Sequence, residues 1–140
     1  MGTYVVGVDG SSTAATTVER ARNLARATGA AIHVVCAYAD SRHGASVVTA
    51  PAEPERSSFL TAQTLVDGVV EGLRSAGVAA TGAVDEGKPA DVLLASAAAI
   101  GAELIIVGNR RMQGVSRILG SVASEVAHHA PCDVLIVKTV

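Results

Sequence analysis

Residues 104–121 read L-I-I-V-G-N-R-R-M-Q-G-V-S-R-I-L-G-S, and this stretch decides the fold. Its first four residues are an apolar run typical of a buried strand, and an amphipathic helix is predicted from about Ser121 onward. The loop between them holds three glycines, Gly108, Gly114 and Gly120. A glycine-rich loop that ends at a helix N-terminus presents backbone N–H groups to an anion. The stretch therefore predicts a strand, a phosphate-binding loop and a helix in succession.

The positive charge of this loop is a local feature. Arg110, Arg111 and Arg117 lie between Glu103 and Glu125, with no acidic residue in that interval, although the whole chain has a formal net charge of −2. A weakly negative chain has no general attraction to nucleic acid or to an anionic membrane, so neither is expected as a partner. The arginines indicate a site for a small anion.

Composition indicates one domain over residues 1–140. Of the 140 residues, 49% are hydrophobic and 17% are charged, which favours a folded chain. No basic leader and no run of 18 apolar residues are visible, so a cytoplasmic location is expected. Cys36 lies in an apolar strand and is expected to be a buried, reduced thiol. His128 and His129 are adjacent and cannot chelate as an i, i+4 pair would, so no metal site is expected.

Strand and helix patterns alternate along the chain. Apolar runs predict strands over 3–8, 30–38, 78–84, 104–107 and 133–138, and helical spacing of apolar residues predicts helices over 14–28, 62–73, 88–100 and 121–129. The polar segment 40–58 is predicted to be a surface loop. This order predicts an α/β, Rossmann-like, doubly wound fold in a single domain, with a five-stranded, mostly parallel sheet and four helices.

Ligands of such sheets bind beyond the carboxyl ends of the strands. The first and fourth strands are expected to be neighbours, which would place Asp9 opposite the loop that begins at Gly108. Asp9 could instead cap the helix that follows it, and Ser121 is expected to be the N-cap of the last helix. These capping roles are compatible with ligand contact.

With these residues placed, the whole chain resembles the universal stress protein family, and specifically its ATP-binding branch. The resemblance rests on V-V-G-V-D-G-S at 5–11, E-G-K-P-A-D at 86–91, the loop from 107 to 122, and A-P-C-D-V-L-I-V at 130–137. The family loop reads G-x2-G-x9-G-[S/T]. Gly108, Gly120 and Ser121 match it, but Arg111 stands at the second glycine and the spacer after it is one residue shorter. Gly114 could supply the missing flexibility.

The resemblance implies a site for ATP, with or without Mg2+. Asp9 would hydrogen-bond the ligand near its base or ribose, and Ala37 would line the adenine pocket. The last helix would bind phosphate through main-chain N–H groups and the Ser121 hydroxyl. The full set of implied binding residues is Gly7, Val8, Asp9, Ala37, Val107, Gly108, Arg110, Arg111, Gly114, Gly120, Ser121 and Val122.

Two other binding functions are open at this point. The shortened loop and Arg111 would also suit AMP or cyclic AMP, and the chain could be a dimeric interaction module that binds no nucleotide. No activated nucleophile or carboxylate pair is apparent, so we expect a sensor or regulator of the stress response, with slow ATP hydrolysis at most. The protein partner is not indicated.

A homodimer is also predicted. Residues Val134, Leu135, Ile136 and Val137 form a continuous apolar strand, which this topology places at the edge of the sheet. An apolar edge strand invites pairing with a second copy of itself.

Overall fold

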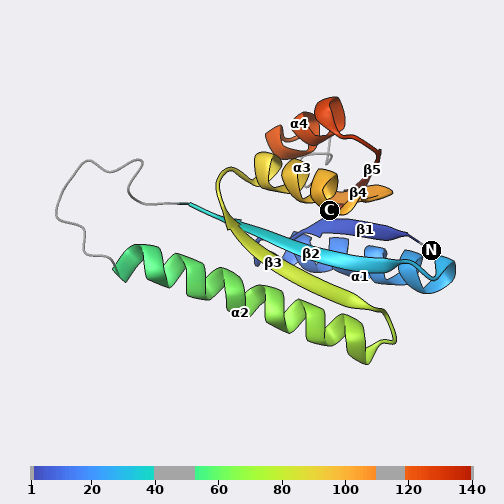
Figure 1. Ribbon diagram of the computed structural model, residues 1–140, viewed down its shortest axis with the longest axis horizontal. Coiled ribbons are helices and arrows are strands. Elements are labelled where there is room, and N and C mark those ends of the chain that lie inside the picture. Colours follow the sequence, from blue (N-terminus) through green and yellow to red (C-terminus); the bar gives the residue numbers. More distant parts are fainter. Residues whose placement is uncertain (1, 40–52, 110–118, 140) are drawn as a thin grey trace.

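The computed structural model describes residues 2–39, 53–109 and 119–139, in which strands and helices alternate (Figure 1). This alternation confirms the predicted α/β class. In chain order the elements are β1 (Thr3–Gly7), α1 (Ser12–Thr28), β2 (Ala31–Tyr38), α2 (Glu53–Ser75), β3 (Ala80–Glu86), α3 (Pro89–Ile100), β4 (Leu104–Asn109), α4 (Ser121–His129) and β5 (Asp133–Lys138).

The strands form one sheet in the order β3-β2-β1-β4-β5, and every neighbouring pair is parallel. The chain moves outward from β1 to β3 and then returns to place β4 on the other side of β1. The direction of winding therefore reverses between β1 and β4, as predicted, and this is where doubly wound sheets open a crevice for a ligand. The last strand, β5, lies at the edge of the sheet, also as predicted.

Two helix layers cover the sheet, with α1 and α2 on one face and α3 and α4 on the other (Figure 1). Successive strand residues point to opposite faces, so Val6 packs toward α1 and α2 while Val5 packs toward α3 and α4; both are 0% exposed. This burial on both faces explains why the strand sequences are continuous apolar runs. None of the described helices has the length and apolar character needed to cross a bilayer.

Helix α2 is longer than the sequence indicated. It begins at Glu53, so the end of the predicted 40–58 loop is helical, while residues 40–52 lie outside the described residues. A polar turn with Pro54 near its start suits a helix N-terminus but carries no apolar periodicity, which is why the pattern did not reveal it. Strand β3 is likewise displaced, spanning 80–86 where 78–84 was predicted.

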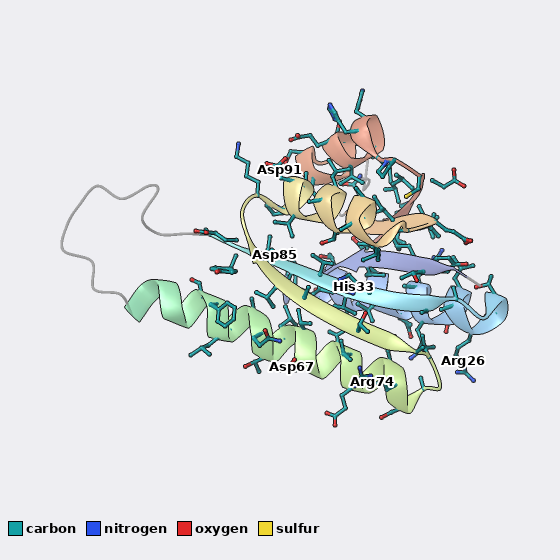
Figure 2. All side chains as sticks on the ribbon, in the orientation of Figure 1. Arg26, His33, Asp67, Arg74, Asp85 and Asp91 are labelled. Atoms are coloured by element: carbon teal, nitrogen blue, oxygen red, sulfur yellow. The ribbon has the colours of Figure 1, made fainter. Side chains whose placement is uncertain are left out.

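Arg74 joins the end of α2 to the start of β3. Its Nε and Nη2 atoms donate to the carbonyl oxygen of Ala80 at 3.0 and 2.8 Å (Figure 2 labels Arg74). We expect Arg74→Met to lower the free energy of unfolding by about 1–2 kcal/mol, because charged donors make the stronger hydrogen bonds.

Urea denaturation measures this difference. Arg26→Met is the matched control, because Arg26 lies in the last turn of α1 and makes no side-chain hydrogen bond to the described residues. Arg74→Lys should recover part of the loss. Equal effects of the two methionine variants would show that the paired bond to Ala80 contributes nothing.

Candidate functional site

A cleft opens at the carboxyl ends of the strands, beside the reversal between β1 and β4. Its volume is about 270 Å³, near the lower end of the range for small-molecule sites. The ends of β1, β2 and β4 and the first turns of α1, α3 and α4 line it. The lining residues are Gly7, Val8, Asp9, Thr13, Ala14, Thr17, Val35, Ala37, Pro89, Val92, Leu93, Val107, Gly108, Asn109, Gly120, Ser121, Val122 and Ala123.

Most of the residues predicted from the sequence meet in this cleft. The structure brings together Gly7, Val8, Asp9, Ala37, Val107, Gly108, Gly120, Ser121 and Val122. The other three predicted residues, Arg110, Arg111 and Gly114, lie outside the described residues. Two segments that are distant in sequence, β1 and the start of α4, therefore contribute to one concavity.

Asp9 faces the cleft from the turn between β1 and α1. Its Oδ1 atom accepts hydrogen bonds from the backbone N–H of Ser11 at 3.0 Å and from the Ser11 hydroxyl at 2.6 Å. Ser11 is the N-cap of α1, and its hydroxyl oxygen accepts from the Ala14 N–H at 3.2 Å. Asp9 is therefore not the N-cap of α1, which was the alternative role for it. It orients Ser11, which is the N-cap.

Gly108 lies where a side chain would not fit. A Cβ atom at this position would collide with the Thr17 hydroxyl and lie 3.0 Å from Cγ2 of Thr139. Thr17 is 1% exposed and its hydroxyl donates to the Thr13 carbonyl at 3.0 Å. The first glycine of the loop is therefore required by the close approach of α1 and of the chain that follows β5.

Helix α4 begins at the cleft with an open N-terminus. The N-cap is Gly120, with φ −70° and ψ 167°, and within the part of the chain that the structure describes no side-chain hydrogen bond caps the helix. The prediction that Ser121 is the N-cap was therefore wrong, since Ser121 is the first helical residue. The backbone N–H groups of Ser121 and Val122 have no acceptor within the helix, and the helix dipole adds positive potential there.

The N–H of Gly120 has a different partner. It donates to Oδ1 of Asn109 at 2.9 Å, a bond between residues eleven positions apart. Asn109 is the last residue of β4 and is 4% exposed. The amides that α4 offers to the cleft are consequently those that follow Gly120.

Sequence reasoning missed several lining residues. Thr13 and Thr17 come from α1, and Pro89, Val92 and Leu93 come from α3. Val92 and Leu93 belong to the apolar face of α3 and are buried, so they serve the core and the cleft together. Pro89 was detectable, because the first residue of a helix that follows a parallel strand lies at the ligand-binding edge.

Cys36 lies near this end of the sheet as a buried free thiol, which confirms the prediction from its apolar strand. Burial raises the pKa of the Cys36 thiol, and the negative charge of Asp9 raises it further. Both effects oppose formation of the thiolate, the form that reacts as a nucleophile.

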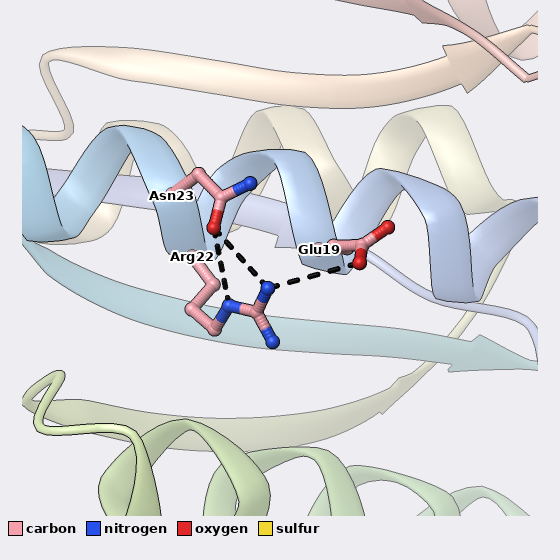
Figure 3. A network of polar contacts seen from close by, with 3 residues as sticks. All are labelled: Glu19, Arg22 and Asn23. Carbon is pink, nitrogen blue, oxygen red and sulfur yellow. Dashed lines mark hydrogen bonds and ion pairs between the residues drawn. The ribbon is translucent and has the colours of Figure 1, made fainter.

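A second cavity of about 530 Å³ lies between α1 and α2. Its walls include Val18, Leu65 and Val69, and the charged groups on its α1 side contact one another. Arg22 lies 3.7 Å from Glu19 and donates to Oδ1 of Asn23 at 3.3 and 3.2 Å (Figure 3). The first cleft, in contrast, combines an open helix N-terminus with an apolar wall, so we take it as the functional site.

Comparison with known proteins identifies the family. The universal stress protein family pattern matches residues 1–138. The chain is also 33% identical over 138 residues to a universal stress protein of Staphylococcus aureus strain USA300, covering 96% of this chain and 82% of the relative. The chain belongs to the universal stress protein family.

Solved structures of universal stress proteins share this fold. One, in complex with cAMP, is 29% identical with a TM-score of 0.76, covering 99% of this chain and 98% of that chain. Another, from Archaeoglobus fulgidus in complex with dAMP, is 22% identical with a TM-score of 0.74 over 99% and 98% of the two chains. The likeness to the dAMP complex concerns the fold alone, whereas the cAMP complex is also more similar to this chain in sequence.

Proposed function

We propose that this universal stress protein binds an adenine nucleotide in the cleft between β1 and β4, and acts as a cytoplasmic sensor or regulator in the stress response. The observation that carries the proposal is the open N-terminus of α4 in the same cleft as Asp9. The cAMP complex of the 29% identical relative supports the ligand class.

The phosphate end of the ligand lies at α4. The N–H groups of Ser121 and Val122 donate to phosphate oxygens, and the helix dipole favours the negative charge. Gly108 lines this end of the cleft, and its lack of a side chain lets α1 and Thr139 pack closely against the end of β4. Arg110, Arg111 and Gly114 are proposed to complete this end of the site.

The nucleoside end lies between β1, β2 and α3. Ala37 and the buried side chains of Val92 and Leu93 provide an apolar surface for the base. Asp9 is exposed to the cleft and accepts hydrogen bonds, so it binds a ribose hydroxyl. Its second carboxylate oxygen is available for this bond while Oδ1 holds Ser11.

A nucleoside monophosphate, AMP or cyclic AMP, is the favoured ligand. Three solved universal stress proteins hold cAMP, dAMP and AMP, and the cAMP complex is 29% identical to this chain. ATP, with or without Mg2+, is the second candidate, because Gly108, Gly120 and Ser121 keep three positions of the ATP-binding loop pattern.

Calorimetric titration of nucleotide-free protein tests the proposal. AMP, cyclic AMP and ATP are titrated separately, the last with and without Mg2+, and are then competed pairwise for one site. We expect saturable heat from at least one of them and a weaker response for adenosine. Absence of heat and of any thermal shift at millimolar concentrations of all three nucleotides would refute nucleotide binding.

We also propose that the protein is a homodimer formed through β5. This strand lies at the sheet edge, where Val134, Leu135 and Ile136 are only partly buried. Light scattering at micromolar concentration should give twice the 14.0 kDa chain mass, and Ile136→Pro should give a monomer because proline removes a strand N–H donor.

The matched control is Ala83→Pro, which also removes the N–H donor of a strand residue, here in β3 at the opposite edge. Circular dichroism verifies that both variants remain folded. A 14 kDa wild-type species, or equal dissociation by both prolines, would contradict pairing through β5.

A further inference from the structure

Asn109 connects the two ends of the glycine loop. It ends β4, and its Oδ1 atom accepts the N–H of Gly120, which precedes α4, at 2.9 Å. This side-chain hydrogen bond joins residues eleven positions apart, and both of its ends lie at the cleft.

The same bond determines where α4 starts. The Gly120 carbonyl accepts the Ser124 N–H at 2.9 Å, so the Gly120 peptide group is held on one side by Asn109 and on the other by the helix. The N–H groups of Ser121 and Val122 follow directly. A residue on β4 therefore holds the peptide group that precedes these two amides.

The neutral amide of the Asn109 side chain suits this position. Asn109 is 4% exposed and lines the cleft. Aspartate would accept the same N–H but would add a negative charge close to the proposed phosphate, and like charges repel strongly where water is excluded. A neutral acceptor holds the Gly120 N–H without this repulsion.

We propose that Asn109 is a positioning residue, which holds the Gly120 peptide group and thereby aims the first amides of α4 at the phosphate. The inference rests on the proposed nucleotide site, and it concerns a residue that the glycine pattern does not include. It acts through Gly120 and the helix, so its loss should impair the binding of phosphate more than the binding of the nucleoside.

Two measurements test this inference. Hydrogen exchange of the Gly120 amide in ligand-free protein should be about tenfold faster in Asn109→Ala, which corresponds to a lost hydrogen bond of about 1.4 kcal/mol. Affinity for AMP should fall about tenfold while affinity for adenosine stays within twofold. Asn109→Asp should keep the Gly120 amide protected from hydrogen exchange and should still lower the affinity for AMP.

Gly120→Pro provides a second route if Asn109→Ala folds poorly. The φ of −70° suits proline, which removes the N–H donor and should reproduce the AMP defect. The two changes should be non-additive when combined, because they break the same bond. Thr139→Val is the matched control, since the buried Thr139 hydroxyl has no hydrogen-bond partner among the described residues and does not line the cleft.

The outcomes separate the two proposals. If the wild type binds no nucleotide, the proposed function fails, and exchange at Gly120 still reports whether Asn109 holds the Gly120 N–H. Unchanged exchange in Asn109→Ala would overturn the inference. Equal losses of AMP and adenosine affinity would also overturn it, because they would indicate general damage to the cleft.

Discussion

Gly108→Ala is expected to destabilise the fold by about 1–3 kcal/mol, the usual cost of overpacking a filled site. The new methyl group would meet the Thr17 hydroxyl at less than contact distance and would lie 3.0 Å from Cγ2 of Thr139. Both threonines are buried, at 1% and 7% exposed, so neither can move into solvent without disturbing α1 or the end of the chain. Nucleotide affinity should fall together with stability, because β4 would be displaced at the cleft.

The experiment compares three variants by chemical denaturation and nucleotide titration. Gly68→Ala is the matched control, since a Cβ at this helical position would meet nothing within 4 Å, and it should gain up to about 1 kcal/mol from helix propensity. Thr17→Ala should partly rescue Gly108→Ala, because the Cβ of residue 17 would then lie at an ordinary 3.6 Å. A stability of Gly108→Ala equal to that of the wild type would show that the contact relaxes freely.

The arrangement of the sheet could be predicted because apolar periodicity follows directly from burial. Strands such as β1 and β4 are covered on both faces, so their sequences are unbroken apolar runs between turn residues. Once the strands are parallel, their carboxyl ends share one edge, and Asp9 must approach Gly108 when β1 pairs with β4. This reasoning placed residues from β1, β2, β4 and α4 in the same cleft.

Other details depend on tertiary contacts that leave no periodic signal. The bond from Asn109 to Gly120 joins residues eleven positions apart, and the sequence shows only that one is polar and the other small. The N-cap of α4 is Gly120, which makes this bond, whereas local preference favoured Ser121 as the cap. The start of α2 was missed for a related reason, since a polar first turn has no apolar face that could indicate a helix.

Ser121→Pro is expected to weaken the binding of AMP or cyclic AMP by about 10- to 100-fold, because it removes a donor to a charged acceptor worth about 1.5–3 kcal/mol. The fold should be unaffected. Proline is favoured at the first position of a helix, and the Gly120 ψ of 167° already suits a residue that precedes proline. The variant thus removes one backbone N–H without breaking α4.

Calorimetry with AMP and with adenosine measures the effect of this change. Ser121→Ala keeps the N–H and removes the hydroxyl, so the difference between the two variants isolates the backbone donor. Adenosine affinity and the melting temperature should match those of the wild type, because the nucleoside end of the cleft and the start of α4 are both intact. A proline variant that binds AMP as tightly as the alanine variant would mean that the Ser121 amide is not a phosphate ligand, and the phosphate would then have to be held by other groups of the glycine loop.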